Sequence, residues 1–123
     1  MELLGPLAEG RSNVVLLDPV DYPTLVWLLD RCHLALTDSG GIQEEAPALG
    51  KPVLVMRQVT ERPEGIEAGA ARLVGANRQR IVCAVEELLS NQGAYGRMSR
   101  AVNPYGDGQA SGRVLDALVR YLV

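Results

Sequence analysis

Residues 37–52 read TDSGGIQEEAPALGKP. An apolar run at residues 34–36 precedes this segment and another at residues 53–56 follows it, and both runs predict buried strands. Between them, a glycine-containing turn leads into a short helix. That order places free backbone N–H groups and the positive end of a helix dipole at the C-terminal tip of a strand, where phosphate binds well.

The same alternation of apolar runs and helical patterns extends along the whole chain. The patterns predict strands near residues 14–17, 34–37, 53–56 and 72–74, and helices near residues 22–32, 41–49, 81–89, 95–102 and 114–122. Asp21 and Asn77 are predicted to cap two of the helices. Pro47 either kinks the helix predicted near residues 41–49 or moves its start beyond Gly41.

Short apolar strands that alternate with helices indicate an α/β fold with a parallel sheet covered by helices on both faces. We expect a single, partial Rossmann-like domain over residues 1–123. Ligands of such sheets gather at the C-terminal ends of the strands. The Ser39 turn and the charged loop at residues 57–62 both leave such ends, so we expect them to line one crevice.

Composition argues against several classes of partner and location. The net charge is −3, with 12 basic and 15 acidic residues and no polybasic run, which argues against nucleic-acid and anionic-membrane partners. No apolar run is long enough to span a membrane, no signal-peptide pattern is visible, and the two cysteines are isolated, so we expect a cytoplasmic protein. The sequence suggests no metal site and no cofactor. Cys32 and Cys83 are interpreted as packing residues on apolar helix faces.

Ser39, Gly40 and Gly41 are the first candidate binding residues. Glycines allow a ligand close to the backbone and the serine hydroxyl adds a donor, which suits a diphosphate. The alternative is a tight strand-to-helix turn with a serine cap.

Glu44 and Glu45 follow the turn on the same helix. Adjacent helical residues point about 100° apart, so we expect one carboxylate to serve the ligand and the other to be structural. A carboxylate can accept two hydroxyl hydrogen bonds, which suits the vicinal diol of a ribose. A solvated helix face is the simpler explanation.

Arg62 is a candidate phosphate clamp in the loop after the third predicted strand. An ion pair with Glu61, Glu64 or Glu67 is an equally good interpretation of this arginine. His33 directly precedes a predicted strand and is interpreted as structural.

Taken together, the motifs resemble one family, the non-hydrolysing UDP-N-acetylglucosamine 2-epimerases. The resemblance rests on Asp18-Pro19, on residues 34–47 (LALTDSGGIQEEAP), on residues 50–57 (GKPVLVMR), on residues 60–64 (TERPE) and on residues 103–108 (NPYGDG). It covers nearly the whole chain, in order and with matching spacing. Part of it is also similar to the broader signature of glycosyltransferase-B-type folds.

The resemblance implies roles for the candidate residues. Ser39, Gly40 and Gly41 would hold the UDP diphosphate, Glu45 the ribose hydroxyls, and Arg62 the nucleotide-sugar. A glutamine and a phenylalanine usually surround the uracil in that family, whereas the aligned positions here carry Val20 and Leu25.

The resemblance also implies that this chain corresponds only to the C-terminal part of the second of two domains. The family's catalytic residues would then lie outside it, the family reaction being inversion at C2 by elimination and re-addition of UDP. We therefore expect UDP or a UDP-sugar as ligand, no catalytic residue in this chain, and no turnover by the chain alone.

Two sheet strands of the family fold would be missing between residues 14–17 and 34–37. The chain would have to close that gap, or pair with a second copy or a separate N-terminal half, so we expect a homo-oligomer or a rearranged assembly. Two alternatives remain open: a UDP-sugar-binding part of a glycosyltransferase-type protein, and a non-catalytic association module.

Overall fold

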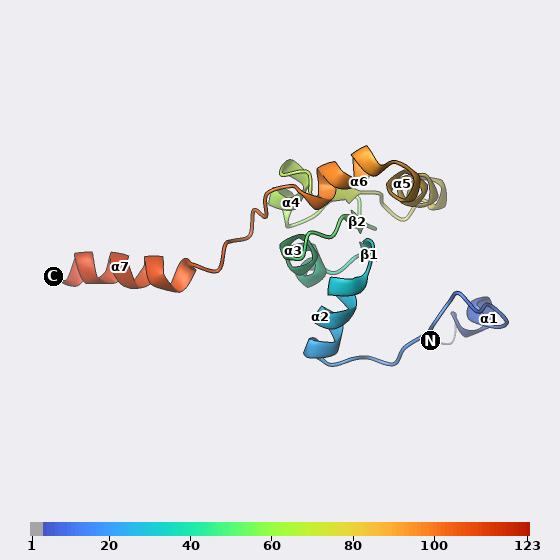
Figure 1. Ribbon diagram of the computed structural model, residues 1–123, viewed down its shortest axis with the longest axis horizontal. Helices are drawn as coiled ribbons and strands as arrows, with labels where there is room; N and C mark the ends of the chain where they lie inside the picture. The colour runs from blue at the N-terminus through green and yellow to red at the C-terminus, as the bar shows by residue number, and fades with distance from the viewer. Residues whose placement is uncertain (1–3) are drawn as a thin grey trace.

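The computed structural model describes residues 4–123 and shows a small α/β body with a helix at each end of the chain lying away from it (Figure 1). The elements are α1 (Gly5–Ala8), α2 (Tyr22–Arg31), β1 (Ala35–Thr37), α3 (Gly40–Ala48), β2 (Val53–Val55), α4 (Pro63–Glu67), β3 (Ala71–Leu73), α5 (Arg78–Ser90), α6 (Gln92–Ser99) and α7 (Ala110–Leu122).

The sheet is parallel, with the order β1-β2-β3. Ala35 pairs with Val53, and Val53 pairs with Ala71, so the three strands end at the same edge. The strand–helix alternation therefore forms the predicted α/β fold, and the C-terminal ends of β1 and β2 lie side by side as expected.

Helices cover both faces of the sheet, as predicted (Figure 1). Val53 and Val55 point to one face, where they pack with α2 and α3. Leu54 points to the other, where it packs with Leu88 of α5 and with α6. All three β2 side chains are buried, which explains why this strand is apolar without alternation.

Local sequence determines where the helices begin. Asp21 accepts a hydrogen bond from Thr24 N (3.0 Å) and Asn77 accepts one from Arg80 N (3.0 Å), so both predicted caps are confirmed. Of the two alternatives predicted for Pro47, the later helix start is wrong, because α3 begins at Gly40 and reaches one residue past Pro47. The proline lies in the last turn, where its missing N–H removes a single helical hydrogen bond.

The predicted strand at residues 14–17 is wrong. These residues form no regular element and are exposed, and Figure 1 shows the segment between α1 and α2 running outside the body. A strand needs a neighbour that accepts and donates its backbone hydrogen bonds, and residues 4–123 provide none there. The outer edge of β1 is likewise unpaired among the described residues, and Leu36 on that strand is 41% exposed. The chain thus does not close the predicted gap by itself.

Three other predictions concern single residues. Cys32 packs partly against the core, as expected, but Cys83 is exposed on α5, so its interpretation as a packing residue is wrong. Val102 lies beyond the end of α6 and is exposed rather than part of a helix face. His33 stacks on Tyr95 with ring centroids 4.1 Å apart, which agrees with a structural role.

Candidate functional site

The Ser39 turn connects the C-terminal end of β1 to the N-terminus of α3. Ser39 is the N-cap residue, with extended dihedral angles, and its N–H donates to Thr37 Oγ1 (3.0 Å). Its hydroxyl makes no capping hydrogen bond. Among residues 4–123, the N–H groups of Gly40, Gly41 and Ile42 find no acceptor, so the turn presents unpaired donors at the positive end of the helix dipole.

The two glycines have different surroundings. A Cβ on Gly40 would lie 3.0 Å from Glu61 Oε1 and 3.7 Å from Arg62 Nη2, whereas one on Gly41 would have only Ser39 Oγ nearby, at 3.8 Å. Gly40 therefore permits the loop after β2 to lie directly against the turn. Gly41 is exposed and leaves its side of the turn open to solvent.

Arg62 reaches this turn from the loop after β2, as the sequence predicted. Its guanidinium Nε donates to Glu44 Oε1 in a charged hydrogen bond. Arg62 therefore does form an ion pair, but its partner is Glu44 and not Glu61, Glu64 or Glu67. The hydrogen bond and charge of Glu44 raise the pKa of Arg62 above its usual range, so the side chain stays cationic. Both side chains remain partly exposed, which screens their attraction.

A short hydrogen-bond chain fixes the loop that carries Arg62. Arg62 N donates to Thr60 Oγ1 (3.0 Å), and the Thr60 hydroxyl donates to Gln43 Oε1 (2.6 Å). Gln43 is only 1% exposed and lies in the first turns of α3. No role for Gln43 or Thr60 was predicted from the sequence. Their spacing of 17 residues carries no periodic signal. The only clue was that Gln43 lies in the motif at residues 34–47 and Thr60 in the motif at residues 60–64.

Glu45 lies on a different flank of α3 from Glu44. It lines a cavity of about 160 Å³ between α2 and α3, together with Tyr22, Val26 and Leu29. Among the described residues it forms no ion pair. The two carboxylates therefore diverge as predicted, with Glu44 held by Arg62 and Glu45 available beside α2. The structure brings Ser39, Gly40, Gly41 and Arg62 together and places Glu45 around the helix from them.

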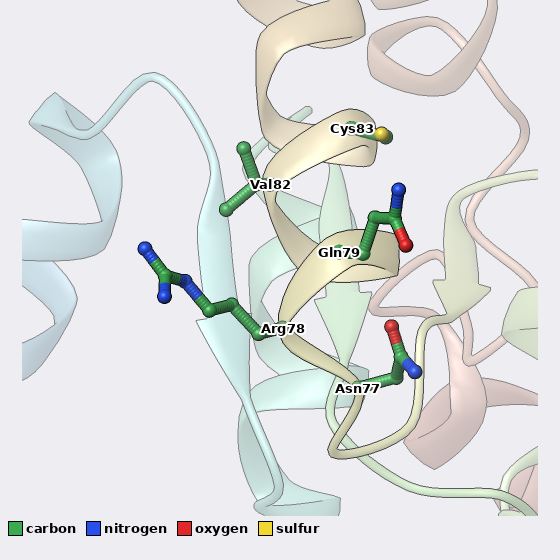
Figure 2. A pocket seen from close by; sticks show the side chains of 5 residues that line it. All are labelled: Asn77, Arg78, Gln79, Val82 and Cys83. Atoms are coloured by element: carbon green, nitrogen blue, oxygen red, sulfur yellow. The ribbon is translucent and has the colours of Figure 1, made fainter.

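A second hollow, of about 470 Å³, lies along the first turns of α5 (Figure 2). Figure 2 shows that Arg78 and Val82 point to one side of the helix while Gln79 points to the other. The side chain of Asn77 is already used as the helix cap. Because these groups diverge, the hollow has no convergent set of donors for a ligand.

No cluster of His, Cys, Asp and Glu side chains within residues 4–123 has the arrangement of a metal site. None of the helices in that range combines the length and apolarity needed to cross a membrane.

Comparison with known proteins agrees with the fold and identifies one family. The sequence model described as "UDP-N-acetylglucosamine 2-epimerase" matches residues 2–119. The chain is 62% identical over 107 residues to the UDP-N-acetylglucosamine 2-epimerase of Escherichia coli K12, covering 87% of this chain and 28% of that protein. It is 55% identical over 120 residues to a probable enzyme of the same name from Ralstonia solanacearum, covering 98% of this chain and 32% of that protein.

Solved structures give the same result. A putative UDP-N-acetylglucosamine 2-epimerase from Listeria monocytogenes superposes with a TM-score of 0.94 and 42% identity over 98% of this chain and 32% of that one. The UDP-GlcNAc 2-epimerase of Neisseria meningitidis, solved with UDP-GlcNAc bound, has a TM-score of 0.91 and 43% identity over 97% and 33%. The chain thus spans about a third of the length of the relatives it matches.

Proposed function

Because the chain belongs to the UDP-N-acetylglucosamine 2-epimerase family, we propose that it supplies the UDP-binding C-terminal part of a non-hydrolysing enzyme of this kind. In this proposal residues 1–123 are one incomplete nucleotide-sugar-binding domain. The whole enzyme converts UDP-N-acetylglucosamine to UDP-N-acetylmannosamine by eliminating UDP and adding it back.

The observation that carries the proposal is the uncapped start of α3 beside Arg62. Unpaired N–H groups and a guanidinium, both at the end of β1 and against Gly40, form a site complementary to a diphosphate. The proposal is further supported by the Neisseria meningitidis relative, whose structure contains UDP-GlcNAc.

The same groups suit the chemistry of the reaction. A base removes the C2 proton, the C1–O bond to UDP breaks, and negative charge grows on the departing diphosphate. Fixed N–H donors at Gly40 and Gly41 would stabilise that charge with little reorganisation. No residue of this chain is assigned as the base, so we propose that the catalytic groups lie on a separate part of the enzyme.

Glu45 is proposed to accept hydrogen bonds from the ribose hydroxyls. The test is calorimetric titration of the 123-residue chain with UDP. The Glu45→Ala variant should bind about 1–3 kcal/mol more weakly, because charge-assisted hydrogen bonds are lost. Glu86→Ala is the matched control, since Glu86 is an exposed carboxylate on α5. No measurable UDP binding by the unmodified chain would overturn the proposal, and epimerase turnover by that chain would overturn the assignment of catalysis to a separate part.

A second candidate function, association without catalysis, is favoured by the unpaired edge of β1 and the half-exposed Leu36. We propose that this edge pairs with another polypeptide, either a second copy of the chain or a separate N-terminal half. We further propose a cytoplasmic location, where UDP-sugars would be accessible to the site.

A further inference from the structure

The motif at residues 103–108 lies more than 40 residues from Arg62 in sequence, yet it contacts the loop that carries this arginine. Tyr105 Oη donates to the carbonyl oxygen of Arg62 (3.3 Å). The N–H of Arg62 donates to Thr60 Oγ1 (3.0 Å). Side chains from two separate motifs therefore hold both backbone polar groups of Arg62.

The Tyr105 phenol has a second partner in the same turn. Gly65 N, in the first turn of α4, donates to Tyr105 Oη (3.0 Å), which satisfies an N–H that the helix itself leaves unpaired. A Cβ on Gly65 would lie 2.7 Å from Tyr105 Oη, so only glycine permits this approach. The phenol thus bridges the residue before α4 and the first turn of α4.

The tyrosine is itself fixed by its own motif. Tyr105 N donates to Asn103 Oδ1 (3.1 Å), and Asn103 Nδ2 donates to Gly106 O (3.1 Å). Burial of the ring raises the pKa of the Tyr105 phenol above its usual value, so the hydroxyl keeps the proton that it donates to Arg62.

We propose that Tyr105 is a positioning residue for Arg62: its hydroxyl holds the turn at residues 62–65 so that the guanidinium stays against the Gly40 turn, where the diphosphate binds. This inference rests on the proposed function. Arg62 Nη2 lies 3.7 Å from where a Gly40 Cβ would be, so a small rotation of the Arg62 backbone would withdraw the charge from the turn. A guanidinium held in place loses less conformational entropy when it binds an anion.

The test uses the 123-residue chain and the Tyr105→Phe variant, which keeps the ring and removes both hydrogen bonds. Tyr121→Phe is the matched control, since Tyr121 is 90% exposed on α7. Without ligand, amide hydrogen exchange at Gly65 should become about tenfold faster in Tyr105→Phe only. With UDP, calorimetry should show binding weakened about three- to tenfold in Tyr105→Phe only.

A double-mutant cycle separates positioning from general stability. In an Arg62→Ala background, the Tyr105→Phe change should leave UDP affinity unchanged, because the group that Tyr105 positions is gone. An equal loss of affinity in both backgrounds, or unchanged exchange at Gly65, would overturn the role of Tyr105 while the proposed function stands. Absence of UDP binding in the unmodified chain would overturn the proposed function. It would also overturn UDP as the ligand that Arg62 is positioned to bind. The exchange measurement would still report on the Tyr105–Gly65 contact.

Discussion

At the residue scale, Gly65 is a position where an added methyl group would clash with a fixed neighbour. An added Cβ would lie 2.7 Å from Tyr105 Oη and 3.5 Å from the two nearest ring carbons. Gly65→Ala should therefore lower the free energy of unfolding by about 1–3 kcal/mol, the usual cost of overpacking. In a Tyr105→Phe background the loss should shrink, because only ordinary ring contacts at 3.5 Å remain.

Urea denaturation of the four variants in this cycle measures the coupling. Gly112→Ala is the control, because nothing lies within 4 Å of the Cβ it would add. Equal losses from Gly65→Ala in both backgrounds would mean that the clash with the hydroxyl does not determine the cost.

Residue types with a strong local preference were predictable, and residue pairs were not. The Ser39 turn and Arg62 were selected because glycines after a strand and an arginine in a strand-end loop have direct chemical uses. The Arg62–Glu44 pair joins residues 18 apart, and three nearer glutamates competed for the same arginine. Only the approach of the loop to α3, which depends on how Gly40 and Gln43 pack, selects the true partner.

At the element scale, α5 depends on its N-cap. Asn77 Oδ1 accepts from Arg80 N, and α5 contributes Ala84 and Leu88 to the core on one face of the sheet. Asn77→Ala should lower the free energy of unfolding by about 1 kcal/mol, because a first-turn N–H loses its partner. Thermal denaturation followed by circular dichroism measures the change. Gln79→Ala, two residues further along the same exposed turn, should have little effect, and an equal loss from both variants would argue against capping.

Capped helix starts are easier to predict from sequence than strands for a physical reason. A cap and a 3.6-residue apolar period are local, so the beginnings of α2 and α5 follow from Asp21 and Asn77 alone. A strand exists only beside a partner, and the apolar run at residues 14–17 has none among residues 4–123. The apolar pattern there predicts that these residues pack against another surface, but it does not identify that surface.

At the scale of the whole molecule, apolar surface is concentrated on segments outside the α/β body. Helix α7 lies away from that body in Figure 1 and buries none of its residues. One side of this helix carries Val114, Leu115, Leu118, Val119 and Leu122, all exposed. Residues 14–17, also outside the body, and Leu36 on the edge strand β1 expose further apolar side chains. A chain that exposes contiguous apolar faces of this kind is expected to associate.

We therefore predict that the chain self-associates, with the apolar side of α7 in the contact. Light scattering after size-exclusion chromatography should give a mass above that of one 13.2 kDa chain, and the mass should fall on dilution. Leu118→Lys should shift the distribution toward the monomer, because it places a charge in the centre of the apolar side.

Asp116→Lys introduces the same side chain about 200° around the helix and should leave the mass unchanged. A monomer at every concentration would contradict the prediction. Equal effects of both substitutions would mean that net charge, rather than the apolar side of α7, controls assembly.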